Sequence, residues 1–169
     1  MAVFAVACRG GGSPITPTST ESGAERVSAA GSIQPASSAE RPPFNLEAIL
    51  RGDGFGLVKF RQQTDSAHNI IDLDVWVRDL SSNTSYSLQR ATDTVLDGTC
   101  TGTNWLKLGK GPTPEPIVTD ERGTGRAELW RDLSAVPAGT TFDIHFRIIE
   151  NATTHVALQS DCYRFVVRN

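Results

Sequence analysis

An alternation of apolar and polar side chains runs through residues 70–78, Ile-Ile-Asp-Leu-Asp-Val-Trp-Val-Arg. Successive side chains of an extended chain point to opposite faces, so one face takes Ile71, Leu73, Val75 and Val77. The other face takes Asp72, Asp74, Trp76 and Arg78. This pattern predicts a half-buried β-strand. A polar turn over residues 79–84 and a renewed alternation at Tyr86 and Leu88 predict a second strand.

Short alternating segments separated by polar turns fill the rest of the chain from residue 44 onward, and no segment has the pattern of an amphipathic helix. The expected strands cover residues 44–50, 57–63, 105–108, 117–119, 127–130, 142–148, 156–158 and 163–167, besides the two above. We expect residues 117–119 and 127–130 to form a hairpin, and residues 91–104 and 109–116 to be loops. About nine short strands predict a single antiparallel immunoglobulin-like β-sandwich. Its core is expected to include Phe60, Val75, Phe142, Phe146 and Phe165.

The composition changes at residue 44. Residues 9–43 are dominated by Gly, Ser, Thr, Pro and Ala, and they contain almost no large apolar side chains. Such a segment cannot bury enough apolar surface to offset the entropy of ordering, which predicts a disordered linker. The domain is therefore expected to span residues 44–169.

The charge pattern argues against a nucleic-acid partner, and the hydropathy argues against a membrane-spanning helix. Sixteen basic and nineteen acidic residues give a net charge of -3, and they form no basic stripe of the kind that binds nucleic acid. No apolar run approaches the roughly 20 residues of a membrane-spanning helix.

The N-terminal segment reads Ala-Val-Ala-Cys at residues 5–8. This resembles the lipobox of bacterial lipoprotein signal peptides, although Ala5 stands in the place of the usual leucine. The resemblance implies lipidation of Cys8 and attachment to a bacterial membrane outside the cytoplasm; a secreted protein is the alternative. Only seven residues precede Cys8, fewer than a signal peptide needs, so we expect residues 1–8 to be its remnant.

Two further cysteines, Cys100 and Cys162, lie within the strand-rich region. An exported protein meets an oxidising compartment, so we expect these two residues to form a structural disulfide. Neither has a Cys or His neighbour at metal-ligand spacing.

Histidine spacing gives no support for a preformed metal site, and no cofactor is expected. His68, His145 and His155 occur singly, and we expect all three to be solvated surface residues.

The chain has no Gly-x-Ser-x-Gly elbow, and we predict that it is not an enzyme. Residues 51–53 spell Arg-Gly-Asp, an integrin-type adhesion tripeptide that also suits a Gly-rich turn between strands.

A large aromatic side chain among charges is the best candidate for a binding surface. Trp76 falls on the polar face of its strand between Asp74 and Arg78. We expect Lys59 and Arg61 to lie across from them on a neighbouring strand. Packing of Trp76 under a loop or a long arginine side chain is the structural alternative.

Two segments resemble known families. Leu80 precedes Tyr86 by six residues, which is similar to the tyrosine-corner segment of fibronectin type III domains and implies a hydrogen bond from Tyr86 back across the turn. The Gly-x-Gly turn at residues 54–56 and the residues 119–125 are similar to CHRD and Cu,Zn superoxide dismutase-like domains. Where the dismutases carry copper-binding histidines, this chain has Tyr86, Ser87 and Leu88, which implies loss of that metal chemistry.

These observations favour a non-catalytic, extracytoplasmic module at the cell envelope, with an envelope or extracellular protein or a glycan as its partner. A purely structural envelope protein fits the same sequence. The alternative from another class is a degenerate dismutase-like metal-binding protein that uses His145 and nearby carboxylates.

Overall fold

The computed structural model describes residues 44–63 and 69–168. The predictions for Cys8, for the linker at residues 9–43 and for His68 lie outside these ranges. Within the described ranges no helix is long and apolar enough to cross a membrane.

The described residues form twelve strands and no helix, which confirms the all-β prediction. The long strands are β1 (Phe44–Gly52), β2 (Phe55–Gln62), β3 (Ile70–Arg78), β4 (Ser85–Asp93), β9 (Gly125–Asp132) and β10 (Thr141–Glu150). The short ones are β5 (Leu106–Lys107), β6 (Gly109–Lys110), β7 (Thr113–Pro114), β8 (Ile117–Val118), β11 (Val156–Ser160) and β12 (Tyr163–Val166).

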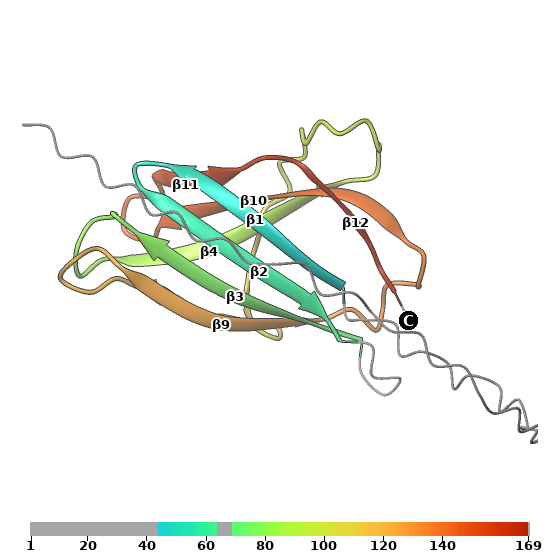
Figure 1. Ribbon diagram of the computed structural model, residues 1–169, viewed down its shortest axis with the longest axis horizontal. Helices are drawn as coiled ribbons and strands as arrows, with labels where there is room; N and C mark the ends of the chain where they lie inside the picture. The colour runs from blue at the N-terminus through green and yellow to red at the C-terminus, as the bar shows by residue number, and fades with distance from the viewer. Residues whose placement is uncertain (1–43, 64–68, 169) are drawn as a thin grey trace, which may run out of the picture. The chain divides into compact units, whose positions relative to one another are not determined.

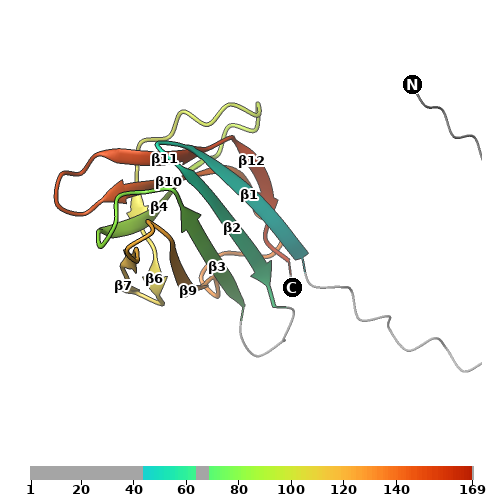
Figure 2. The same cartoon turned by 60° about the vertical axis from the view of Figure 1, so that its left-hand side comes forward.

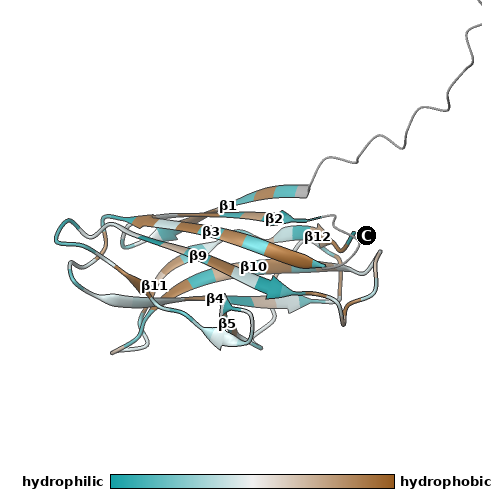
Figure 3. Cartoon of the chain, turned by 90° about the horizontal axis from the view of Figure 1, so that it is seen from below, coloured by the Kyte–Doolittle hydropathy of each residue, from teal (hydrophilic) through white to brown (hydrophobic). Residues whose placement is uncertain are grey.

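The strands hydrogen-bond in the continuous order β5-β4-β10-β11-β1-β2-β3-β9-β6-β7, with β12 beside β10 and β8 beside β4. This sheet curves back on itself (Figures 1 and 2). Seen from below, β1, β2, β3 and β9 form one layer and β4, β10 and β11 the facing one (Figure 3). The ladder passes from one layer to the other through the pairing of β11 with β1. An immunoglobulin-like sandwich of two separate sheets therefore stays a prediction.

The open side of the sheet, between β4 and β9, is bridged at two places. Residues 106–110 pair with β4 through β5 and with β9 through β6. Residues 117–119 pair with β4 through β8 and reach β9 through the Thr119–Gly125 bridge. The sheet is therefore nearly closed.

The core lies between the two layers. The apolar set of β3, Ile71 to Val77, is at most 9% exposed, as the period-two pattern predicts. Phe60 packs between Phe146 and Phe165, with ring centroids 5.8 Å and 5.3 Å away. Phe142 is only partly buried at the edge of this cluster. The five predicted core residues thus all belong to the core or its rim.

Three details of the prediction were wrong. The described residues hold twelve strands where about nine were expected, because the Gly- and Pro-rich residues 109–116 form the β6–β7 hairpin. β8 pairs with β4, and only Thr119 bridges to β9, so the expected 117–130 hairpin is reduced to its turn. β4 continues to Asp93, so it takes in the first three residues of the loop expected at residues 91–104.

The expected hydrogen bond of Tyr86 is present. Tyr86 is 2% exposed, and its hydroxyl accepts a hydrogen bond of 3.2 Å from the Ser81 amide. Gly123 packs against the same turn with φ of 72°, and a Cβ atom there would lie 2.0 Å from the carbonyl oxygen of Leu80. Only glycine fits this position, and it allows the 79–84 and 120–124 turns to pack closely against each other.

Candidate functional site

The outer face of β2, β3 and β9 carries three rows of side chains set by strand register. Trp76 lies between Leu57 of β2 and Arg126 of β9. In the next row Asp74 lies between Lys59 and Glu128. The third row contains Arg61, Asp72 and Trp130. All these side chains point away from the core because their neighbours in each strand point into it.

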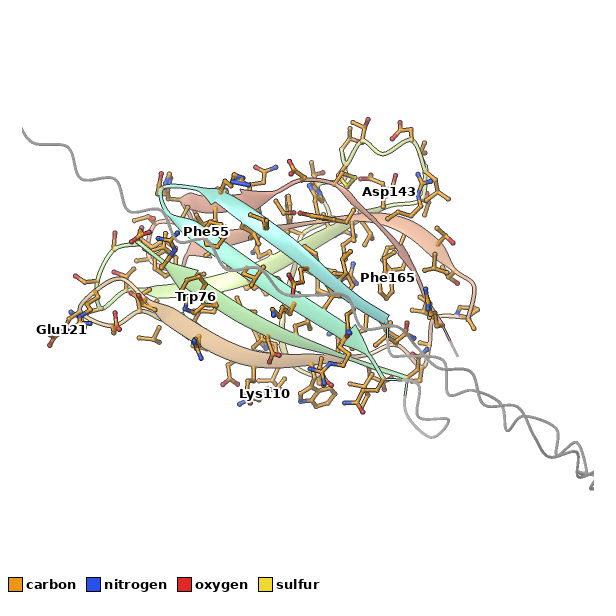
Figure 4. All side chains as sticks on the ribbon, in the orientation of Figure 1. Phe55, Trp76, Lys110, Glu121, Asp143 and Phe165 are labelled. Carbon is orange, nitrogen blue, oxygen red and sulfur yellow. A yellow bond between two sulfur atoms is a disulfide. The ribbon has the colours of Figure 1, made fainter. Side chains whose placement is uncertain are left out.

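Trp76, labelled with Phe55 in Figure 4, is half-buried and packs against Phe55 and Arg78. The Phe55 ring meets it edge-on, with the centroids 6.1 Å apart. The guanidinium of Arg78 lies 5.1 Å from the Phe55 centroid and 5.9 Å from that of Trp76. Arg78 also donates a 2.7 Å hydrogen bond to Asp79. The indole is therefore fixed in position, which reduces the entropy that a ligand would lose on contact with it.

A shallow groove of about 890 Å³ runs beside Trp76. The outer face of β2, β3 and β9 is its floor, and Lys110, Glu115 and Pro116 around the β6–β7 hairpin form one wall. Its charged lining is balanced, with three basic and three acidic side chains: Lys59, Lys110, Arg126, Asp74, Glu115 and Glu128. Lys110 and Glu115 form an ion pair of 3.1 Å. Such a lining suits a polar ligand without net charge.

The five residues of the predicted surface thus share one face. Lys59 lies directly across from Asp74 and forms an ion pair of 3.0 Å with Glu47 of β1. Arg61 lies across from Asp72, two positions from the groove, and Arg78 lies across from Phe55. Lys59, Asp74 and Trp76 line the groove, while Arg61 and Arg78 do not. No sequence pattern predicted the β6–β7 wall, because β6 pairs with a residue of β9 that is distant in sequence.

The expected disulfide is present. Cys100 and Cys162 are joined, with their Cα atoms 5.3 Å apart. The bond fastens the loop at residues 94–105, which two aspartates hold as well. Asp93 accepts hydrogen bonds from the amides of Thr101 and Gly102, each of 3.0 Å.

Asp143 is the second aspartate, and it is buried under the same loop. It accepts a 3.1 Å hydrogen bond from Nε of Arg164 and a 2.9 Å bond from the amide of Gly98. These hydrogen bonds hold the pKa of Asp143 below its ordinary value, and the bond from Arg164 has a larger effect than the bond from Gly98.

The prediction for His145 was wrong. Its side chain is buried, its Nε2 lies 3.1 Å from the carbonyl oxygen of Gly102, and its ring stacks on Trp105 at 4.5 Å. The reason is that the 94–105 loop covers the outward face of β10, which the alternation alone assigns to solvent. The prediction for His155 is confirmed: it is exposed, and its Nε2 lies 2.7 Å from Asp53 of the Arg-Gly-Asp turn. Throughout residues 44–63 and 69–168, no three His, Cys, Asp or Glu side chains are grouped to hold a metal ion.

Sequence reasoning missed two arginines that point inward. Arg90 continues the inward series Tyr86 and Leu88 of β4, and Arg131 continues the inward series of Ala127 and Leu129 of β9. Both line a cavity in the core. The signal was present, because extending each alternation by one step places an arginine on the core face.

No protein-family model matches this chain, and a search of curated proteins finds no match either.

Proposed function

We propose that this protein is a non-catalytic binding module that works outside the cytoplasm, at a bacterial cell envelope, and recognises a glycan through the groove beside Trp76. The disulfide supports an oxidising compartment, because such bonds are rare in the cytosol. We further propose that Cys8 is lipidated and that residues 9–43 form a tether. The two facing layers and the Tyr86 hydrogen bond support an immunoglobulin-like sandwich as the domain class.

The observation that carries the proposal is the combination of a fixed indole with balanced charges in one open groove. A sugar presents C–H groups on one face and hydroxyls around its rim. An aromatic ring favours the apolar face, and carboxylates, lysines and arginines form hydrogen bonds with the hydroxyls. The groove volume of about 890 Å³ lies within the range typical of ligand sites.

The test is titration of the protein with a panel of neutral oligosaccharides by isothermal calorimetry. We expect at least one to bind, and Trp76→Ala to weaken that binding by about 30-fold or more, since a buried tryptophan contact contributes about 2 kcal/mol. Val118→Ala is the control, because Val118 is exposed and does not line the groove. Equal affinities for the wild type and Trp76→Ala would overturn the assignment. An envelope protein captured in a Trp76-dependent way, with no glycan binding, would replace the glycan by a protein partner.

The lipid anchor is tested separately. Metabolic palmitate labelling of the full-length precursor should be lost in Cys8→Ser, because Cys8 is the proposed acceptor. Equal labelling of the two proteins would refute the anchor without affecting the groove.

A further inference from the structure

A cavity of about 240 Å³, partly open to solvent, reaches into the core beside residues 106–111, where the sheet nearly closes. Its walls are almost entirely apolar. Four phenylalanines, Phe60, Phe142, Phe146 and Phe165, form one side, and Leu108 and Leu133 contribute to the rest. Phe165 of β12 is 1% exposed, and its ring lies 5.3 Å from those of Phe60 and Phe142, centroid to centroid. An apolar space of this kind favours hydrocarbon over water.

Two arginines interrupt the apolar wall. Arg90 is on β4 and Arg131 on β9, the two long strands that face each other across the bridged side of the sheet. Nη1 of Arg90 lies 3.4 Å from the hydroxyl oxygen of Thr92, and Nη1 of Arg131 donates a 3.2 Å hydrogen bond to the carbonyl oxygen of Gly111. Both of these acceptors are uncharged.

Neither guanidinium forms an ion pair with a carboxylate of the described residues. The pKa of Arg90 is lowered mainly by burial, and to a smaller extent by the nearby positive charge of Arg131. Two partly desolvated like charges in an apolar wall destabilise the free protein. The same arrangement stabilises an anion placed between them, and guanidinium groups bind carboxylates and sulfates through paired hydrogen bonds.

We propose that this cavity binds an amphipathic organic anion, with its hydrocarbon part among the phenylalanines and its charged head on Arg90 and Arg131. The site is on the inner face of the sheet, and it is independent of the glycan groove on the outer face. Size restricts the ligand. An apolar cavity of about 150 Å³ admits benzene, so about 240 Å³ suits an alkyl chain of roughly eight to ten carbons.

Calorimetric titration of the full chain with four ten-carbon probes tests the head-group chemistry. Decanoate and decyl sulfate carry an anionic head, decanol a neutral one and decyltrimethylammonium a cationic one. We expect both anions to bind at least about 10-fold more tightly than decanol, because a hydrogen bond to a charged group is worth about a factor of 10 or more. The cation should not bind. Decanoate binding without decyl sulfate binding would restrict the ligand to carboxylates. Equal binding of all four probes, or of none, would refute the proposal.

Matched variants test the residues. Arg90→Gln and Arg131→Gln should each weaken decanoate binding by about 10-fold or more and leave decanol binding unchanged. Arg122→Gln, an exposed arginine on the 120–124 turn, is the charge-matched control and should bind decanoate as the wild type does. Wild-type affinity in both cavity variants would overturn the assignment of the head-group site.

The apolar part of the site is tested by a substitution that shortens it. Ile144→Phe adds volume to the cavity wall, so the preference should move from decanoate toward octanoate. An unchanged chain-length preference in a folded Ile144→Phe variant would show that the chain does not enter this cavity. Should that variant not fold, the glutamine substitutions still decide the proposal.

Discussion

Removal of the Cys100–Cys162 disulfide should lower the free energy of unfolding by about 4 kcal/mol. The bond closes a loop with a sequence separation of 62 residues. The chain-entropy relation gives roughly 4 kcal/mol for a loop of this length at 25 °C, through restriction of the unfolded chain. Both cysteines are half-buried, so serine at each position meets little desolvation penalty. Asp93 and Asp143 hold the same loop without the disulfide, so we expect the native fold to persist.

The assay is urea unfolding of Cys100→Ser/Cys162→Ser in a parent chain that carries Cys8→Ser, which prevents mispairing with the third thiol. The urea midpoint should fall by the equivalent of about 4 kcal/mol. Reduction of the parent should lower its stability by the same amount and should leave the double serine variant unchanged. A loss of less than about 1 kcal/mol would refute the argument, because the unfolded chain would then not be significantly restricted by this bond.

Two further predictions concern the turns and the buried carboxylate. Gly123→Ala should destabilise the protein by at least about 2 kcal/mol, whereas Gly139→Ala should cost only about 1 kcal/mol. Both glycines have positive φ, but only the Cβ at 123 meets a carbonyl oxygen; equal losses in thermal unfolding would contradict this. Asp143→Asn should be less stable than the wild type at pH 7. Because the folded-state pKa of Asp143 is depressed, its stabilisation is present above the unfolded-state pKa and is lost as the pH falls through the folded-state value. The difference in urea midpoint between Asp143→Asn and the wild type should therefore shrink in acid, and a constant difference would argue against the assignment.

Period-two alternation predicted the long strands because each has one face in the core and the other against solvent or a covering loop. β3 is the clearest case, since every second side chain from Ile71 to Val77 is buried. The same rule placed Trp76, Asp74 and Lys59 on one outer face before their pairing was known. What the pattern could not supply was strand order, because the pairing of β11 with β1 joins residues more than 100 positions apart.

Short segments with distant partners were beyond the reach of sequence patterns. β6 and β7 have two residues each, too few to show alternation. Their strand conformation comes from pairing with each other and from the pairing of β6 with β9. The β6–β7 wall of the groove and the bridge between β4 and β9 at residues 106–110 therefore could not be predicted from sequence patterns. The prediction for His145 was wrong for a related reason, since the loop that covers it is held to β10 by Asp143 and to residue 162, next to β12, by the disulfide.

Of three residues that depart from the alternation of apolar inward and polar outward side chains, packing within the fold stabilises only one. Trp76 is an aromatic residue in an outward position, and Phe55 and Arg78 pack against it, so folding alone explains part of its placement. Arg90 and Arg131 are charged residues in inward positions, and their hydrogen-bonding partners, the Thr92 hydroxyl and the Gly111 carbonyl, are neutral oxygens. A leucine at either position would continue the apolar wall without the desolvation of a charge. Stability therefore does not account for the two arginines, whereas an anionic ligand does, and the head-group titration separates these two explanations.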